Sequence, residues 1–168
     1  MNLRKLELKD APFMLEWMHD ESIVKHLRAN FATKTIDDCK TFIAEAADPS
    51  HDLHLAIVDD HDTYMGTVSL KHITSSSAEF AIIVRKVALG KGYSKYAMSE
   101  IIRIGLEELK LDRVYWCVSP DNKRAVRFYD KNGYQRIKQP CSIPSQITGG
   151  YTQYQVAYYI WYQKTKNQ

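Results

Sequence analysis

Residues 84–94 read VRKVALGKGYS, and they decide how this chain can fold because they join an apolar strand to an amphipathic helix through a glycine loop. Gly90 and Gly92 carry no side chain, so backbone N–H groups in this loop can approach an anion closely. The helix that follows adds the positive end of its dipole at the same place, and Lys91 adds a charge. This junction predicts a site for a pyrophosphate group.

The glycine loop differs from two common phosphate-binding motifs. It contains neither GxxxxGK[ST] nor the GxGxxG fingerprint with its ribose-binding acid. Taken alone, the loop is explained equally well as a turn that simply joins a strand to a helix. A second motif is therefore needed to decide between a ligand site and a turn.

The order of predicted elements around this junction indicates a mixed sheet. Alternating apolar and polar residues predict a strand at 2–8, and Asp10 is expected to cap the helix that follows it. Thr35 or Asp37 is expected to open a later helix. Further helices are expected at 21–27, 93–110 and 122–131, and further strands at 53–58, 64–72, 78–84, 113–118, 134–138 and 154–162.

The carboxy-terminal part of the chain adds a loop and a tail to this pattern. Residues 140–150 contain two prolines and two glycines and are expected to form a loop. Residues 164–168 are expected to be a frayed tail. The whole order predicts one α/β domain over residues 1–168, with helices on both faces of the sheet, and not a doubly wound nucleotide-binding fold.

Composition argues against several classes of protein. The chain has 168 residues and a formal net charge of +3, which is too small and too scattered to predict nucleic-acid binding. No stretch of about 20 apolar residues could cross a membrane, and the amino terminus lacks the apolar core of a signal peptide. We expect a cytoplasmic protein with no nucleic-acid or membrane partner.

The cysteine and histidine spacings predict no disulfide and no metal site. Cys39, Cys117 and Cys141 are widely spaced and form no CxxC pair, which favours a reducing compartment. Three histidines between residues 51 and 61 flank an expected strand and turn. Nothing in the sequence indicates that they converge on a metal ion.

A second motif follows the glycine loop after one helix and one strand. Residues 122–134 read NKRAVRFYDKNGY and predict a helix that ends at Gly133. Ala125, Phe128 and Tyr129 share one face of this helix. Tyr129 is explained either as an ordinary core residue or as a functional hydroxyl group.

Together the two motifs resemble the GNAT superfamily of acyl-CoA-dependent N-acyltransferases, and the similarity covers nearly the whole chain. The family loop Gln/Arg-x-x-Gly-x-Gly/Ala maps onto residues 89–94, with Gly92 as its central glycine. Leu89 replaces the family's Gln or Arg, and Ser94 replaces its Gly or Ala, but both changes keep the backbone amides that should bind the phosphates. The resemblance implies that acetyl-CoA is bound at Leu89, Gly90, Lys91, Gly92, Tyr93 and Ser94.

The resemblance also implies roles outside the loop. The strand before the loop should pair through its backbone with the pantetheine arm, with Ile82 and Val84 as the contacts. Asn122 matches an asparagine that contacts the cofactor, and Tyr129 matches the tyrosine that protonates the departing thiolate. The implied fold is a three-layer sandwich whose mixed, mostly antiparallel sheet of about seven strands parts into a V.

Acetyl transfer to an amine also needs a base and an oxyanion donor. An alkyl amine ionises near about 10, so it must lose a proton before it attacks the thioester. Glu79 on the strand before the loop is the first candidate base, although it is explained equally well as a solvent-facing carboxylate. His72 is the second candidate, and a backbone N–H near residues 82–84 could bind the oxyanion. Cys117 lies in an apolar run and is expected to be a core residue, since direct transfer needs no covalent intermediate.

The sequence leaves the acceptor amine open, and the amino-terminal helices and residues 140–150 are expected to line its site. Residues 15–23 and 78–80 resemble acetyltransferases of nucleotide-linked amino sugars, which we rank first. Similar features occur in the branch that acetylates ribosomal-protein amino termini, ranked second, and in polyamine acetyltransferases, ranked third. A polyamine site should be rich in acids, and the candidates, which are also explained as helix caps, are Asp20, Glu21, Asp37 and Asp38.

A different class of protein also fits the motifs. An acyl-CoA-binding module without turnover would use the same loop, but it would most simply lack the tyrosine, and Tyr129 is present. The apolar last strand also allows a homodimer.

Overall fold

The computed structural model describes residues 1–166, which group into two compact units. Unit 1 comprises Met1–Lys71 and Ala81–Ile101, and unit 2 comprises His72–Phe80 and the chain from Ile102 onward. Seven strands form one sheet in the order β1-β2-β3-β4-β5-β7-β6, and β4 (Ser77–Val84) contributes residues to both units. The β4–β5 pair is parallel, whereas the β1–β2, β2–β3, β5–β7 and β6–β7 pairs are antiparallel. The expected α/β class with a mixed seven-stranded sheet is confirmed.

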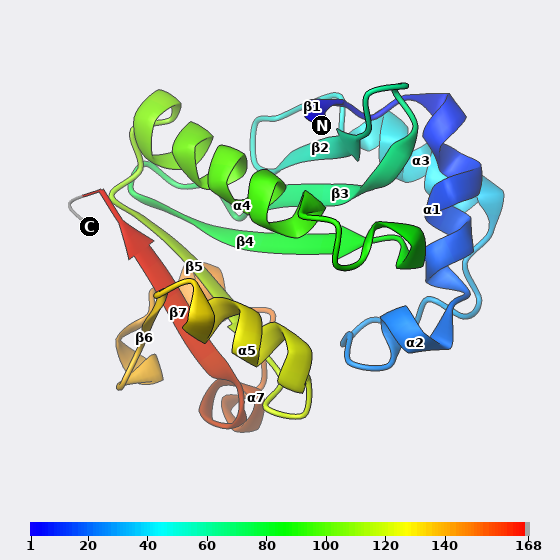
Figure 1. Ribbon diagram of the computed structural model, residues 1–168. Coiled ribbons are helices and arrows are strands. Elements are labelled where there is room, and N and C mark those ends of the chain that lie inside the picture. Colours follow the sequence, from blue (N-terminus) through cyan, green and yellow to red (C-terminus); the bar gives the residue numbers. More distant parts are fainter. Residues whose placement is uncertain (167–168) are drawn as a thin grey trace. The chain divides into compact units, whose positions relative to one another are not determined.

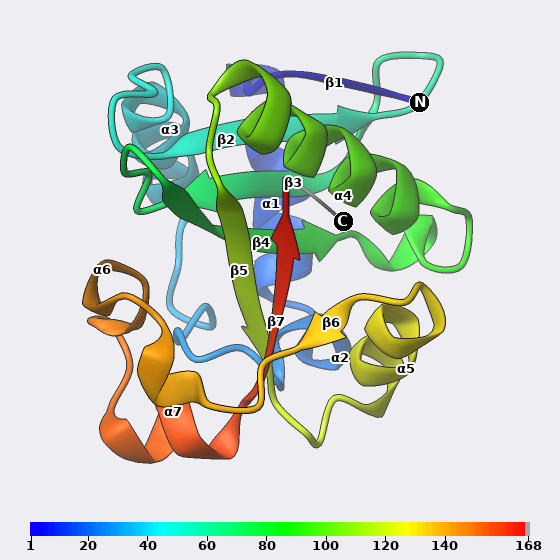
Figure 2. The same cartoon turned by 90° about the vertical axis from the view of Figure 1, so that its left-hand side faces the viewer.

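Unit 1 is a β-sheet that carries helices on both faces. In Figures 1 and 2, α1 and α3 cover one face of β2 and β3, and α4 covers the other. The face toward α1 and α3 buries an apolar cluster that includes Met14, Trp17, Ala56 and Val58. The elements are β1 (Asn2–Lys5), η1 (Leu8–Asp10), α1 (Ala11–Met18), α2 (Glu21–Val24), α3 (Ile36–Glu45), β2 (Leu53–Val58), β3 (Tyr64–Lys71), η2 (Lys86–Ala88) and most of α4 (Tyr93–Arg103).

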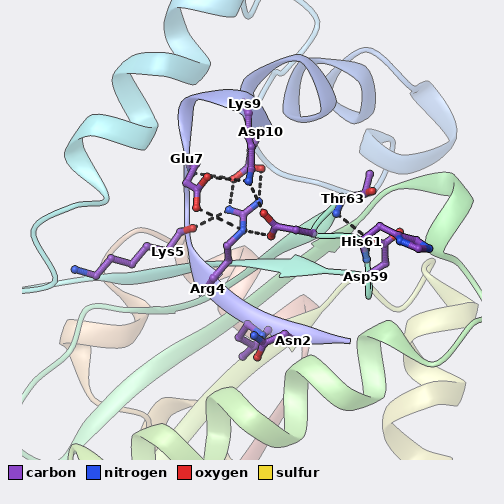
Figure 3. Close-up of polar contacts among 11 residues, drawn as sticks. Asn2, Arg4, Lys5, Glu7, Lys9, Asp10, Asp59, His61 and Thr63 are labelled. Atoms are coloured by element: carbon purple, nitrogen blue, oxygen red, sulfur yellow. Dashed lines mark hydrogen bonds and ion pairs between the residues drawn. The ribbon is translucent and has the colours of Figure 1, made fainter.

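A buried ion pair fixes the start of unit 1. Both terminal nitrogens of Arg4 donate to the carboxylate of Asp10 at 2.8 Å, and the Glu7 N–H donates to the same carboxylate at 2.9 Å (Figure 3). The pKa of Arg4 is raised, chiefly by this bond to Asp10. Asp10 therefore closes the turn between β1 and α1, and no side-chain hydrogen bond caps α1. Asp10 occupies the N-cap position of α1, as predicted, but its side chain does not cap the helix because Arg4 and the Glu7 amide use its oxygens.

The backbones of β3 and β4 approach each other unusually closely at Gly66. A Cβ atom added at Gly66 would lie 2.3 Å from the carbonyl oxygen of Ile83 and 2.9 Å from the Cα of Val84. The contact lies beside an irregularity in β3, where Ile57 pairs with Gly66 but Val58 pairs with Tyr64. Only glycine fits this position without a shift of the backbone.

In unit 2, aromatic side chains lie on both faces of β5 and β7. Trp116 and Tyr162 stack at 5.8 Å and contact Tyr129 of α5 on one face. On the other face, Tyr115 and Trp161 pack in a cluster with residues of α6 and its neighbours. The elements are η3 (Ile104–Glu108), β5 (Arg113–Val118), α5 (Lys123–Lys131), β6 (Gln135–Arg136), η4 (Pro140–Ser142), α6 (Ser145–Thr148), α7 (Gln153–Tyr158) and β7 (Ile160–Thr165).

The carboxy-terminal part differs from expectation in three places. The expected strand at 154–162 begins as helix α7, because Thr152 and Gln155 form a capping box, and β7 starts only at Ile160. Residues 140–150 contain η4 and α6 instead of a plain loop. In the expected frayed tail, Lys164 and Thr165 pair with β5, and residues 167–168 lie outside the described part of the chain.

The starts of α3 and α5 agree with the predicted helices. Thr35 caps α3 through a bond from the Asp38 amide, and Asn122 caps α5 through a bond from the Ala125 amide. The expected helix at 93–110 consists of α4 and the π-helical turn η3, where the Leu109 N–H donates to the Ile104 carbonyl oxygen at 2.9 Å.

Substitution of Gly66 tests the close approach of β3 and β4. We expect Gly66→Ala to lower the free energy of unfolding by about 3 kcal/mol, because the new methyl group overpacks the backbone of β4. Gly133→Ala is the matched control, since Gly133 has a φ of 73° but open space where a Cβ atom would lie. That control should lose only about 1 kcal/mol, from its left-handed backbone. Equal losses in urea denaturation would show that the contact at Gly66 relaxes without cost.

Candidate functional site

The glycine loop of unit 1 places two glycines in the left-handed backbone region. Gly90 and Gly92 have φ values of 75° and 89°, in the left-handed region that favours glycine. No atom lies within 4 Å of a Cβ atom added at Gly90, and the Met1 side chain, at 3.7 Å, is the contact for one added at Gly92. The loop is thus open above both glycines.

The loop leads directly into a helix start. α4 begins at Tyr93, and the Tyr96 N–H donates to the Gly92 carbonyl oxygen at 3.0 Å. The first-turn amides of an α-helix have no partner within the helix and favour a negative charge. Lys91 and Lys95 are exposed, whereas Leu89 and Ser94 are half-buried. This geometry fits the predicted phosphate cradle.

A cavity of about 430 Å³ lies in unit 1, on the face of the sheet that carries α1 and α3. Aromatic rings line much of it: Trp17 and Phe31 make an edge contact at 5.2 Å, and Phe42 and His54 lie 4.8 Å apart. β4 contributes Ile82 and its two neighbours to the wall. The other predicted contact, Val84, is buried beside Gly66.

The charges around the cavity balance. Two cations, Lys34 and Lys71, and two anions, Asp38 and Glu45, line it. The His54 Nδ1 lies 2.7 Å from the Ser69 hydroxyl oxygen, and burial lowers the pKa of His54, so the imidazole is neutral at pH 7. The cavity is therefore an aromatic site with both signs of charge. Of the acids predicted for a polyamine site, Asp38 lines this cavity, whereas Asp20, Glu21 and Asp37 are not among its lining residues.

Unit 2 brings together Glu79 and His72, the two base candidates. Glu79 lies on β4 with a side chain that is 4% exposed, which excludes the solvent-facing interpretation. Its Oε2 atom is 3.5 Å from the Nε2 atom of His72, whose side chain is 47% exposed. His72 has a φ of 53°, in the left-handed region, at the turn that follows β3.

Tyr151 completes this cluster, and the sequence did not point to it. The Tyr151 hydroxyl donates a short hydrogen bond to Oε1 of Glu79. Burial raises the pKa of Tyr151, and the neighbouring Cys117 and Glu79 raise it further, so the hydroxyl stays protonated. A double glycine at 149–150 precedes Tyr151, but no spacing rule connects that position to β4.

Tyr129, the predicted acid, lies on the other face of β5. It is 7% exposed and packs against Trp116, Tyr134 and Tyr162. Burial raises the pKa of Tyr129, and Cys117 adds to the shift. The hydroxyl therefore stays protonated at neutral pH and can act as a donor.

Asn122 and Cys117 have local roles in unit 2. The Asn122 Oδ1 atom accepts a hydrogen bond from the Ala125 amide at 3.2 Å and so caps α5. Cys117 is half-buried against the cluster of Tyr115 and Trp161.

The described residues, 1–166, hold no group of three or more His, Cys, Asp or Glu side chains that could bind a metal ion. None of the helices in this range combines the length and the apolar character needed to cross a membrane.

Comparison with known proteins gives one family. Residues 1–135 match the family model described as an acetyltransferase (GNAT) domain. The chain is 24% identical over 142 residues to an uncharacterized N-acetyltransferase p20 of Bacillus licheniformis, which covers 81% of this chain and 79% of that protein. It is also 24% identical over 135 residues to acetyltransferase PseH of Campylobacter jejuni, which covers 79% of this chain and 82% of that protein.

Solved structures show the same fold. The structure of spermidine N-acetyltransferase from Vibrio cholerae in complex with CoA and spermine superposes with a TM-score of 0.78 at 19% identity. The likeness covers 99% of this chain and 95% of that one. At this identity it establishes the fold and leaves the acceptor open.

Substitution of Gly92 tests whether the open space above the glycine loop binds the cofactor. We expect Gly92→Trp to abolish acetyl-CoA binding in titration calorimetry, because the indole would fill the open space above the loop. Gly92→Ala is the matched control: it carries the same backbone strain of about 1–2 kcal/mol but only one methyl group, and it should still bind. Unchanged affinity of the Trp variant would place the phosphates elsewhere, and absence of binding to the unaltered protein would show that the loop is only a turn.

Proposed function

Because this chain belongs to the GNAT acetyltransferase family, we propose that it moves the acetyl group of acetyl-CoA to the primary amine of a nucleotide-linked amino sugar. The aromatic, charge-balanced cavity of unit 1 is the observation that carries this choice of acceptor. Flat rings such as those of Trp17 and Phe42 suit a nucleobase or the apolar face of a sugar. Lys34 and Lys71 provide donors for phosphate oxygens.

Charge favours this acceptor over a polyamine. A polyamine carries several positive charges and would be attracted by an excess of carboxylates. The cavity has two acids, but its two lysines offset them. The solved relative with spermine keeps polyamine acetylation as the second candidate, and a protein amino terminus is the third.

The roles of individual residues follow from chemistry and from the family resemblance. The amides around Gly90 and Gly92 bind the pyrophosphate, and the backbone of β4 near Ile82 holds the pantetheine arm. Asn122 contacts the cofactor near α5, although its side-chain oxygen is already engaged as the helix cap. Tyr129 donates a proton to the sulfur as the thiolate leaves.

An acceptor screen tests the proposed activity. Release of free CoA thiol is followed with a uridine-diphosphate-linked amino sugar, spermidine, spermine and a peptide with a free amino terminus. We expect the highest kcat/KM with the amino sugar. A higher value for spermidine or for the peptide would replace the acceptor, and no release with any amine would remove the proposed activity.

Two charge variants of the cavity should shift acceptor binding in opposite directions. We expect Lys71→Met to raise the KM of the amino sugar about tenfold, because a charge-assisted bond is worth about 1.5–3 kcal/mol. Glu45→Gln should leave that KM unchanged or lower it. Both variants should keep the KM for acetyl-CoA. A raised KM in Glu45→Gln together with an unchanged KM in Lys71→Met would indicate a cationic acceptor.

Removal of the Tyr129 hydroxyl tests the acid. We expect Tyr129→Phe to lower kcat about 100-fold or more while acetyl-CoA affinity in calorimetry stays the same. Tyr134→Phe, at a neighbouring ring of the same cluster, is the control and should keep most of the turnover. Comparable losses in both variants would assign the effect to packing.

A further inference from the structure

We propose that His72 accepts the proton of the acceptor amine, and that Glu79 and Tyr151 are positioning residues that hold its imidazole. This inference rests on the proposed acetyl transfer and assigns the base within it. It reverses the order of the two candidates predicted from the sequence, in which Glu79 came first.

The two oxygens of Glu79 are directed to different groups. Tyr151 donates its hydroxyl proton to Oε1, and Oε2 lies 3.5 Å from Nε2 of His72. A buried carboxylate is costly unless it is hydrogen-bonded or paired; here Tyr151 hydrogen-bonds one oxygen, and the imidazole of His72 lies at ion-pair distance from the other. These two contacts restrict the orientation of Glu79, which suits an orienting group better than a mobile base.

The two candidate bases, Glu79 and His72, also differ in the solvent exposure of their side chains. The Glu79 side chain is 4% exposed and the His72 side chain is 47% exposed, so His72 is the member of the pair that can meet an incoming amine and return its proton to water.

The pairing also selects the nitrogen that accepts the proton. A neutral imidazole that carries its hydrogen on Nε2 would direct it toward Oε2 of Glu79, 3.5 Å away, and would leave the lone pair on Nδ1 to accept a proton. The turn that carries His72 is fixed by Thr74, whose backbone N–H donates to the Ser77 carbonyl oxygen at 2.9 Å.

The proposed step is balanced without a further reactant. Nδ1 of His72 takes one proton from the ammonium group, and the nitrogen lone pair forms a bond to the thioester carbonyl carbon. The C–S bond breaks, and the sulfur takes its proton from Tyr129. The new amide nitrogen loses its second proton to Tyr129, and His72 returns its proton to solvent, so one proton is released for each acetyl group transferred.

Groups from three elements around His72 and Glu79 can influence their ionisation. Glu79 comes from β4, Tyr151 from the segment between α6 and α7, and Cys117 from β5. Burial raises the pKa of Tyr151, and Cys117 is the next cause of that shift. Tyr151 is therefore a neutral donor throughout the working range, and Glu79 is the acidic side chain beside His72.

The pH dependence of kcat/KM distinguishes His72 from Glu79 as the base. With the uridine-diphosphate-linked amino sugar, the unaltered enzyme should show a plateau through neutral pH. We expect His72→Gln to lose about 100-fold at pH 7 and to rise with a slope of about one in log kcat/KM as the pH approaches the pKa of the amine itself, because only neutral amine then reacts. Glu79→Gln and Tyr151→Phe should lower the plateau, mainly through kcat, but both variants should retain a plateau through neutral pH.

Matched controls and one spectroscopic measurement complete the test. His61→Gln and Tyr154→Phe alter an exposed turn and a hydroxyl on a residue that is 74% exposed, and both should leave the profile unchanged. In long-range nitrogen NMR of the unliganded protein, His72 should carry its hydrogen on Nε2, and Glu79→Gln should weaken that preference.

The outcomes separate this inference from the proposed function. A plateau that survives in His72→Gln but is lost in Glu79→Gln would make Glu79 the base and overturn the inference, as would hydrogen on Nδ1 of His72 in the NMR spectrum. Absence of acetyl transfer by the unaltered enzyme with every amine in the screen would overturn the proposed function itself, together with the role of His72 in it.

Discussion

At Gly66 the backbone of β3 approaches β4 so closely that a Cβ atom would lie 2.3 Å from the carbonyl oxygen of Ile83. Adjacent strands tolerate such contacts when a Cα–H faces a carbonyl oxygen, and a side chain would force them apart. The Arg85 amide then reaches the Met65 carbonyl oxygen at 2.8 Å, which extends the contact past the end of β4. β4 is thereby held along the half that lines the cavity and leads to the glycine loop.

Arg85 continues the attachment of this strand end. Its guanidinium donates to both oxygens of Glu16 on α1, at 3.0 and 2.7 Å, and to the Tyr64 carbonyl oxygen at 2.9 Å. The Phe13 ring lies 4.4 Å from the same guanidinium carbon. One buried arginine thus ties α1, β3 and β4 of unit 1 together by bidentate geometry that lysine could not reproduce.

The two carboxylates Asp10 and Glu79 are both buried, yet they serve different purposes. Asp10 is matched by the fork of Arg4 and by the Glu7 amide, so its charge serves to close a turn. Glu79 is paired with a hydroxyl group and with an imidazole that reaches solvent. A permanent cation neutralises a carboxylate for structure, whereas a titratable partner leaves the pair able to exchange a proton.

The sequence by itself determined the local elements and the family motifs. The glycines at 90 and 92 have left-handed φ values, and the helix start beside them leaves backbone amides that favour an anion. The cap at Thr35 was likewise predictable, since it involves residues three positions apart. The α/β class followed from the order of these elements.

Only the tertiary structure decided the features that depend on distant residues. Tyr151 meets Glu79 across 72 positions of the chain, and the aromatic lining of the cavity comes from two helices, a strand and a loop that no periodicity connects. The start of the last strand was misjudged because its apolar residues suit a strand and a capped helix equally, and the capping box at Thr152 decided for the helix. Sequence spacing determines the hydrogen bonds between residues that are close together in the chain. Burial arises only when separate elements pack, and it sets the environment of Glu79 and Tyr129.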